Sequence, residues 1–350
     1  MKQPPLLIVL GATATGKSAL GLALAEALGG EIVNADALQA YRGFDIGTAK
    51  PSLAERERIP HHLIDILDPR ERWSAGEFAR QARGAITEIE ARGRRPIVVG
   101  GSGLYLRALL LGISPIPPGD ETVRAELRVR LAAEGLPALY EELERRDPAS
   151  HARLMAGDTQ RILRALEVAI VSGKPQSEWI AERPFGGEPL SALRIGLTLP
   201  RSVLYDGIAG RVARMVEQGW VAEVARRLDE GLDPELPPFQ AIGYRQLVLH
   251  VRGKMSLAEA IEETVRATRR FAKRQETWFR KEPEVTWFAA DSLERLVPSV
   301  LEFARTGWRY HAEAQHQHPG RLPVSESQRG TDDVPRADYR TPTPGPDEKI

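Results

Sequence analysis

Short runs of apolar residues alternate with amphipathic stretches along the chain. The run from Leu6 to Leu10 leads into a glycine-rich turn, and residues 17–28 then show a helical pattern that stops at Gly29 and Gly30. Further strand-like runs lie at 31–34, 96–99 and 193–199. Continuous apolar runs of this length are typical of strands buried on both faces of a parallel sheet. The alternation of strands and helices therefore predicts an α/β fold, with a parallel sheet flanked by helices.

Breaks in this pattern divide the chain into four parts. Prolines and a glycine at 114–119 interrupt it, and the stretch from there to about residue 180 is helical, charged and poor in strands. We expect a helical insertion domain at 116–190 in a core made of 1–115 and 191–308, with helices from 203 to 287. Residues 309–350 hold six prolines and few large apolar side chains. They are predicted to be a disordered tail, because they cannot bury enough surface to offset their ordering entropy.

Composition excludes several kinds of chemistry. The 350 residues include no cysteine, which excludes cysteine catalysis, thiolate metal sites and disulfides. Lysine and arginine together number 48, as do aspartate and glutamate, so global charge indicates no partner. The first apolar run is too short to span a bilayer and precedes a glycine turn rather than a cleavage site. We therefore expect a cytoplasmic monomer without a membrane segment.

One motif points to phosphate. Residues 11–18 match G-x-x-x-x-G-K-[ST] between a predicted strand and a predicted helix, which is the context that a P-loop requires. In a P-loop NTPase-like fold, backbone amides and the helix N-terminus hold a phosphate or nucleotide, the lysine neutralises its charge, and the serine ligates Mg²⁺. The alternative is a chance glycine turn. The predicted phosphate-binding residues are Gly11, Ala12, Thr13, Ala14, Thr15, Gly16, Lys17 and Ser18, with Ser18 as the metal ligand.

The motif does not indicate what carries the phosphate. ATP-hydrolysing P-loop proteins usually have an apolar strand that ends in aspartate, whereas the run at 97–99 ends in glycines. An acid does follow the second predicted strand, at Asp36. Loops at the carboxyl ends of parallel strands line one crevice, so Asp36 could face the same pocket as Lys17. The alternative interpretation of Asp36 is a helix N-cap, and its position alone does not decide between the two.

Several blocks together resemble one family, the tRNA dimethylallyltransferases or tRNA isopentenyltransferases. The blocks occur in order from residue 6 to about 290. They are Gly11 to Ser18, Asp36 to Pro51, His61 to Pro69, Gly100 to Tyr105, Asp158 to Glu167, Gln240 to Arg245 and Thr268 to Arg280. There are departures from the family pattern at Ala12, Thr15 and Ser102, and Ala37 replaces the serine that usually follows the catalytic aspartate.

The resemblance implies a reaction and the residues that perform it. A dimethylallyl group would pass from dimethylallyl diphosphate to N6 of the adenosine adjacent to the anticodon, with the anticodon stem-loop of tRNA as partner. Asp36 would be the general base, with Lys17 and Ser102 as the other catalytic residues. Residues 36–39 and 160–164 would read the flipped adenine. The family-matched tRNA-binding residues are Asp36, Ala37, Leu38, Gln39, Ser102, Arg124, Gln160, Arg161, Ile162, Leu163, Arg164, Gln240, Ala241, Ile242, Gly243, Tyr244 and Arg245.

A basic helix is predicted at 264–281. Ala267, Phe271 and Trp278 share one face and are expected to pack on the core. Arg266, Arg269, Arg270 and Lys273 are then expected to project outward and bind RNA phosphates. Taken alone, such a charge run is more often a solvated helix face.

Three other functions remain open. A small-molecule P-loop kinase would explain residues 11–18, but it would not need the block at 36–51 or the basic helix. A prenyltransferase acting on free adenine nucleotides would not need the helical insertion, and a non-catalytic RNA-binding module would not need a P-loop.

Overall fold

The core of the protein is a parallel six-stranded sheet. The structure is a computed structural model that describes residues 6–183, 186–187 and 189–317. The strands are ordered β3-β2-β4-β1-β5-β6, and every neighbouring pair is parallel. Their bounds are β1 Leu6–Gly11, β2 Gly30–Asn34, β3 His61–His62, β4 Arg95–Gly100, β5 Ala192–Thr198 and β6 Val285–Ala289. This architecture confirms the predicted α/β fold.

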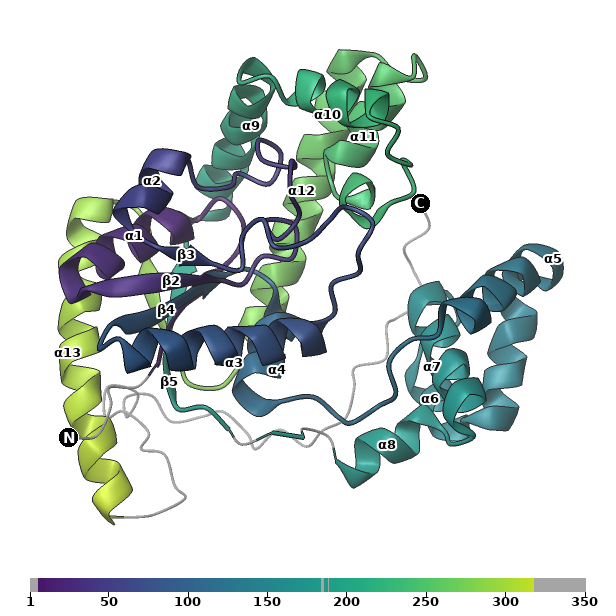
Figure 1. Cartoon of the computed structure of the whole chain (residues 1–350), viewed down its shortest axis with the longest axis horizontal. Helices are drawn as coiled ribbons and strands as arrows, with labels where there is room; N and C mark the ends of the chain where they lie inside the picture. The colour runs from purple at the N-terminus through teal and green to yellow at the C-terminus, as the bar shows by residue number, and fades with distance from the viewer. Residues whose placement is uncertain (1–5, 184–185, 188, 318–350) are drawn as a thin grey trace.

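Helices cover both faces of the sheet (Figure 1). On one face, Leu7 and Val9 of β1 pack with α1 (Lys17–Leu28) and α13 (Leu293–Gln317). On the other, Leu6 and Ile8 pack with α3 (Ala75–Ala91) and α4 (Gly103–Leu111). Successive residues of β1 thus point to opposite layers, and both layers are apolar, as a central parallel strand requires. The short helix α2 (Leu53–Arg58) lies in the long connection between β2 and β3.

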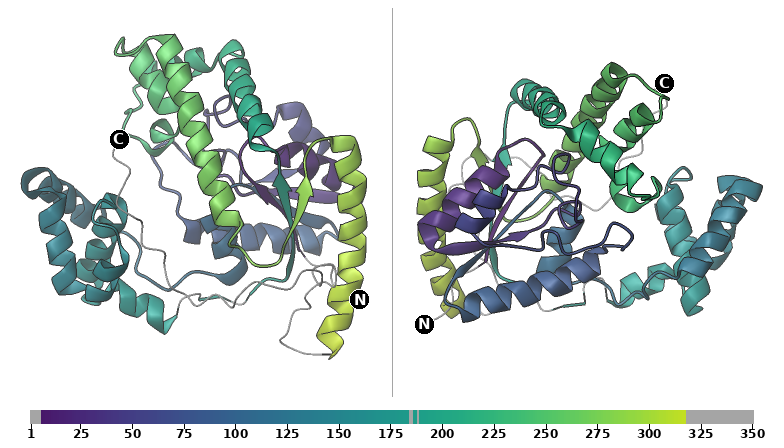
Figure 2. Two further views of the ribbon diagram at one scale, coloured as in Figure 1. Left: turned by 180° about the vertical axis from the view of Figure 1, so that it is seen from behind. Right: turned by 45° about the horizontal axis from the view of Figure 1, so that its top comes forward.

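Two groups of helices project from different sides of this core (Figures 1 and 2). The insertion comprises α5 Glu121–Arg146, α6 Pro148–Arg153, α7 Thr159–Ser172 and α8 Gln176–Glu182, and it has an apolar core of its own. The second group comprises α9 Arg201–Glu217, α10 Trp220–Asp229, the 3-10 helix η1 Pro237–Gln240, α11 Tyr244–Val251 and α12 Leu257–Phe279. Its apolar core also takes in Tyr41 and Phe44, from the connection that follows β2. The second group is therefore tied to the carboxyl end of the sheet.

The chain enters and leaves the insertion along two adjacent segments. The Gly186 N–H donates to the Ile113 carbonyl (3.1 Å), and the Leu190 N–H donates to the Leu110 carbonyl (2.8 Å). Gly112 has φ 78°, and a Cβ there would lie 2.4 Å from the Gly187 nitrogen, so a glycine is needed where the segments meet. These contacts hold the two connections side by side.

The structure corrects three details of the predicted elements. The helical pattern expected to reach Trp287 ends at Phe279, because Val285–Ala289 forms the edge strand β6 beside β5. The two-residue strand β3 was not predicted, since its pairing with β2 is too short to leave an apolar run. Helix α13 continues past the boundary predicted at residue 308 to Gln317, and the rest of the predicted tail lies outside the described residues. Of the helices described here, none is both long enough and apolar enough to cross a membrane.

Candidate functional site

The predicted phosphate loop joins β1 to α1. Gly16 has φ 85° and Ala14 has φ 65°, so the backbone turns twice through left-handed conformations before Lys17 begins the helix. Thr15 Oγ1 donates to the Ala12 carbonyl (2.8 Å) and fixes the turn from inside. The first amides of a helix have no partner within it and attract anions. This geometry is that of a loop that can hold a phosphate group.

Three charged side chains come together beside this loop. Burial, followed by repulsion from Arg211 of α9, lowers the pKa of Lys17 to about 7, and the nearby Asp36 carboxylate opposes the shift. The Lys17 ammonium donates to the Ala12 carbonyl (2.6 Å). Burial also lowers the pKa of Arg211, whereas Asp36 acts to raise it. Two cations and one carboxylate are therefore close enough for their charges to interact, although they come from the start of α1, the loop after β2, and α9.

Asp36 is held by a turn rather than by a helix. The Asn34 side chain accepts the Asp36 N–H (3.1 Å) and donates to the Asp36 carbonyl (3.0 Å). The Asp36 carboxylate accepts the Leu38 N–H through Oδ1 (2.9 Å). Residues 37–40 form turns and no helix begins there, so the helix N-cap interpretation is wrong. The turn leaves Asp36 half-buried at the carboxyl end of β2, where its charge reaches Lys17 and Arg211.

Gln275 of the basic helix α12 joins two loops of this site. Its side chain is buried, accepts the Thr13 N–H (2.8 Å) and donates to the Gly101 carbonyl (2.9 Å). A Cβ at Gly101 would lie 2.4 Å from Gln275 Nε2, so the absence of a side chain there permits the approach. Ser102 follows at the N-cap of α4, half-buried, and its side chain makes no capping hydrogen bond. Gln275 thus fixes the phosphate loop relative to the loop that carries Ser102.

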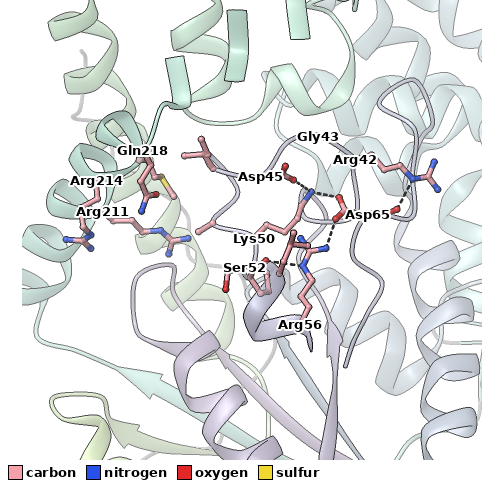
Figure 3. A pocket seen from close by; sticks show the side chains of 15 residues that line it. Arg42, Gly43, Asp45, Lys50, Ser52, Arg56, Asp65, Arg211, Arg214 and Gln218 are labelled. Carbon is pink, nitrogen blue, oxygen red and sulfur yellow. Dashed lines mark hydrogen bonds and ion pairs between the residues drawn. The ribbon is translucent and has the colours of Figure 1, made fainter. Parts of the chain in front are cut away.

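A cavity of about 870 Å³ has Arg211 in its lining (Figure 3). Arg211 and Gln218 line one side, and Lys50 and Arg56 line the other. Lys50 bridges Asp45 and Asp65 at 2.6 Å each, and Arg56 also pairs with Asp65 at 2.6 Å. Burial alone would raise the pKa of Asp65, but the hydrogen bonds from Lys50 and Arg56 hold it below its ordinary value. Arg211, which also lines this cavity, interacts electrostatically with Lys17 and Asp36.

The residues predicted to bind tRNA are not equally accessible. In the insertion, Gln160 and Arg161 are exposed, Leu163 and Arg164 are half-buried, and Ile162 is fully buried in the apolar core. The side chain of Ile162 therefore packs the domain and cannot contact RNA in this conformation, which corrects the prediction for that side chain. Arg124, at the start of α5, is half-buried.

A similar correction applies to two other segments. Gln39 is buried and donates to the carbonyls of Thr48 (3.1 Å) and Ala49 (3.2 Å), so its amide supports the loop after β2. Its neighbours Ala37 and Leu38 are half-buried. Tyr244 is fully buried, and its hydroxyl donates to the Glu223 carboxylate (2.6 Å). The side chains of Gln39 and Tyr244 therefore cannot reach an RNA base in this conformation.

The rest of the segment around Tyr244 is mixed. Gln240 and Arg245 are exposed, Ala241 and Ile242 are half-buried, and the backbone of Gly243 is buried. Gln240 and Arg245 therefore offer the most accessible side chains of this segment.

The basic helix α12 buries its apolar face, as its spacing predicts. One of its arginines, however, does not project outward as predicted. Ala267 is buried, while Phe271 and Trp278 are half-buried. Arg266, Arg270 and Lys273 are exposed. Arg269 does not project outward: its guanidinium lies 5.1 Å from the centre of the Tyr205 ring of α9. The outer basic face is therefore narrower than expected.

The predicted metal site contains few protein ligands. Ser18 is exposed in the first turn of α1, with Asp36 as the carboxylate near Lys17. The described residues contain no cluster of three or more histidine, aspartate or glutamate side chains suited to a metal. Mg²⁺ commonly keeps several waters and binds through one or two protein groups plus substrate phosphates. The residues present fit that mode, in which a diphosphate would supply most of the charge.

Sequence patterns did not single out two residues of this site. Arg211 lies in an amphipathic helix without a motif, and only the fold brings it near Lys17. Gln275 occurs inside a family block, but its role depends on contacts with residues distant in the chain. A signal was present for Gln275, because an amide on the buried face of a helix requires a buried partner.

Comparisons with known proteins agree on one family. The model for "IPP transferase" matches residues 39–282, and that for "Isopentenyl transferase" matches residues 4–65. A tRNA dimethylallyltransferase of Syntrophobacter fumaroxidans is 50% identical over 297 residues, covering 85% of this chain and 87% of the relative. One of Geobacter sulfurreducens is 49% identical over 282 residues, covering 81% of this chain and 91% of the relative.

Solved structures give the same result. The tRNA isopentenylpyrophosphate transferase of Bacillus halodurans is similar with a TM-score of 0.66 and 36% identity, covering 90% of this chain and 100% of that one. A eukaryotic dimethylallyltransferase acting on tRNA is similar with a TM-score of 0.72 and 27% identity, covering 87% of this chain and 79% of that one. By sequence and by fold, the chain therefore belongs to the IPP transferase family.

Proposed function

We propose that the protein transfers a dimethylallyl group from dimethylallyl diphosphate to N6 of the adenosine adjacent to the anticodon of tRNA. The products are N6-(dimethylallyl)adenosine and diphosphate. One observation supports this proposal beyond family membership: the charges of Lys17, Arg211 and Asp36 interact near the carboxyl ends of the strands, beside the phosphate loop. This reaction requires cations that stabilise the departing diphosphate and a base that accepts the proton of the attacking amine.

The donor side uses the phosphate loop. The amides of residues 14–18, the Lys17 ammonium and the Arg211 guanidinium would hold the diphosphate and stabilise the charge that grows as it departs. The Thr13 amide is already taken by Gln275, so it is not counted among these donors. Ser18 would hold Mg²⁺, which would neutralise diphosphate charge. Preorganised cations act most strongly here because the site is partly desolvated.

The acceptor side uses Asp36. The lone pair of N6 attacks C1 of the dimethylallyl group, the C1–O bond breaks, and the diphosphate leaves with that electron pair. The nitrogen then carries an excess proton, which Asp36 accepts. Because Asn34 and the Leu38 amide fix the loop, Asp36 is held in place before substrate arrives.

Recognition of tRNA would use exposed polar and basic side chains on two parts of the protein, the insertion and helix α12. Gln160 and Arg161 lie on the insertion, and Arg270 and Lys273 lie on the outer face of α12. Contacts of this kind neutralise phosphates and release counterions. A donor of five carbons needs no such surface, so these side chains favour a macromolecular acceptor over a free nucleotide.

A single transfer assay separates the candidate functions. Labelled dimethylallyl diphosphate is offered to unmodified tRNA, to AMP and to no acceptor, with ATP hydrolysis measured in parallel. We expect label only in tRNA, at the adenosine adjacent to the anticodon after nuclease digestion. Label in AMP would instead favour a free-nucleotide prenyltransferase, and ATP turnover without transfer would favour a kinase.

A further inference from the structure

A buried carboxylate lies in the insertion, outside the site described above. Glu167 of α7 is 1% exposed. Its carboxylate accepts from Arg124 Nε (2.8 Å), from Arg164 Nη1 (2.7 Å) and from the Asp120 N–H (2.7 Å). Burying a carboxylate is costly unless it is paired and hydrogen-bonded, and these three donors meet that condition. Glu167 thus joins α7 to the start of α5.

The same network holds the segment through which the chain enters the insertion. Arg164 Nη2 donates to the Pro117 carbonyl (2.6 Å), while Glu167 takes the Asp120 amide. A Cβ on Gly119 would lie 1.8 Å from Arg124 Nη2, so the segment passes directly over that guanidinium. Glu121, two residues after Gly119, pairs with Arg72 of the core (3.0 Å). Glu167 therefore fixes both arginines and the connection that orients the insertion on the core.

Charge remains uncompensated in this network. Glu121 also contacts Arg124 (3.8 Å) and Arg128 (3.2 Å), which makes four arginines paired with two glutamates. Asp120, which caps α5 through the Thr122 and Val123 amides, adds one further negative charge. One positive charge is left. The Arg124 and Arg164 side chains are 28% and 31% exposed, beside the segment through which the chain enters the insertion.

We propose that Glu167 is a positioning residue for tRNA: it holds Arg124 and Arg164 as a fixed pair that presents net positive charge to an RNA phosphate. This inference rests on the proposed function, since it takes tRNA as the acceptor. Long arginine side chains lose considerable rotamer entropy when they bind. A buried carboxylate that has already fixed them removes part of that cost at the moment of binding.

The substitution Glu167→Gln tests this role, because it keeps the side-chain size and one acceptor oxygen but removes the charge. We expect the KM for tRNA to rise by about tenfold or more, the range of a lost charge-assisted contact. The kcat and the KM for dimethylallyl diphosphate should stay within about twofold, since the donor site lies on the core. Direct RNA binding should become less dependent on salt, by about one unit in the slope of log affinity against log salt.

The insertion supplies a matched control. Glu142 is also buried there and also pairs with two arginines, Arg130 (2.7 Å) and Arg146 (2.6 Å), neither of which belongs to a family-matched position. Glu142→Gln should lower thermal stability to a similar degree and leave the KM for tRNA and the salt slope unchanged. Equal effects of the two substitutions on tRNA binding would reduce Glu167 to a stabilising residue and overturn the inference.

A second variant keeps the inference testable if Glu167→Gln does not fold. Arg124→Lys retains the charge but loses the planar donor that Glu167 holds. We expect it to raise the KM for tRNA as well, whereas an unchanged KM would show that fixed orientation is irrelevant. If the unaltered protein transfers no dimethylallyl group, the proposed function is refuted. The RNA-binding measurements would still show whether Glu167 is needed for tRNA binding.

Discussion

The protonation of Lys17 makes a sharp prediction about pH. Burial, followed by the charge of Arg211, lowers the pKa of Lys17 to about 7 in the ligand-free protein. The proposed diphosphate donor would bind the ammonium form, so its binding would take up a proton whenever Lys17 is neutral. The free-enzyme pKa appears in the pH profile of kcat/KM for the donor. That parameter should therefore be high below pH 7 and fall as the pH rises through 7.

The expected size follows from the pKa. With a value of about 7, roughly ten in eleven Lys17 side chains carry the proton at pH 6, and roughly one in eleven at pH 8. The kcat/KM for dimethylallyl diphosphate should thus fall about tenfold between these pH values at a fixed, subsaturating concentration of tRNA. The kcat should change less, because bound diphosphate keeps the ammonium charged.

Two substitutions assign the pH effect to this residue. Lys17→Arg keeps a positive charge that does not titrate in this range, so the fall near pH 7 should disappear even if overall activity is reduced. Arg211→Gln removes a like charge, which should move the fall to higher pH. Steady-state transfer with labelled donor from pH 5.5 to 9 measures both. An unchanged fall in Lys17→Arg would refute the reasoning, since another group would then be titrating.

Three further changes have expected outcomes. Asp36→Asn keeps the acceptor for the Leu38 amide but removes the base, so the rate of single-turnover transfer should fall by a factor of roughly 10² to 10⁴. Binding of tRNA should be preserved, and a near-normal rate would exclude Asp36 as the base. The double change Arg270→Gln with Lys273→Gln should weaken tRNA binding and reduce its dependence on salt. Binding titrations at two salt concentrations measure this, and unchanged affinity would indicate that this helix face is only solvated. Gln275→Met removes both hydrogen bonds to the loops, so the KM for the donor should rise severalfold, and an effect confined to the KM for tRNA would contradict its role at the phosphate loop.

The elements that sequence patterns predicted well are those with strong local signals. The central strands carry continuous apolar runs because both faces are buried, and the phosphate loop has its glycines, lysine and serine within eight positions. The edge strand β6 was missed, because it is only partly buried and follows a long helix in the sequence. Its assignment depends on pairing with β5, which residues 285–289 alone do not reveal.

The site was predicted incompletely for a related reason. Gln275 reaches Thr13 across 262 residues of chain, and Arg211 meets Lys17 only after the second helical group has packed on the core. A family block also does not separate a side chain that contacts a ligand from one that supports its neighbours. Tyr244 and Ile162 lie inside such blocks, yet burial shows that they pack the interior.

The paired connections to the insertion have an evolutionary consequence. Because Leu110 and Leu190 are already hydrogen-bonded neighbours, the core sheet and its donor site close without the intervening helices. Insertions at such adjacent points can be lengthened, shortened or exchanged with little effect on the host fold. Lineages can therefore remodel the module at 116–190 while the α/β core and its phosphate loop stay the same.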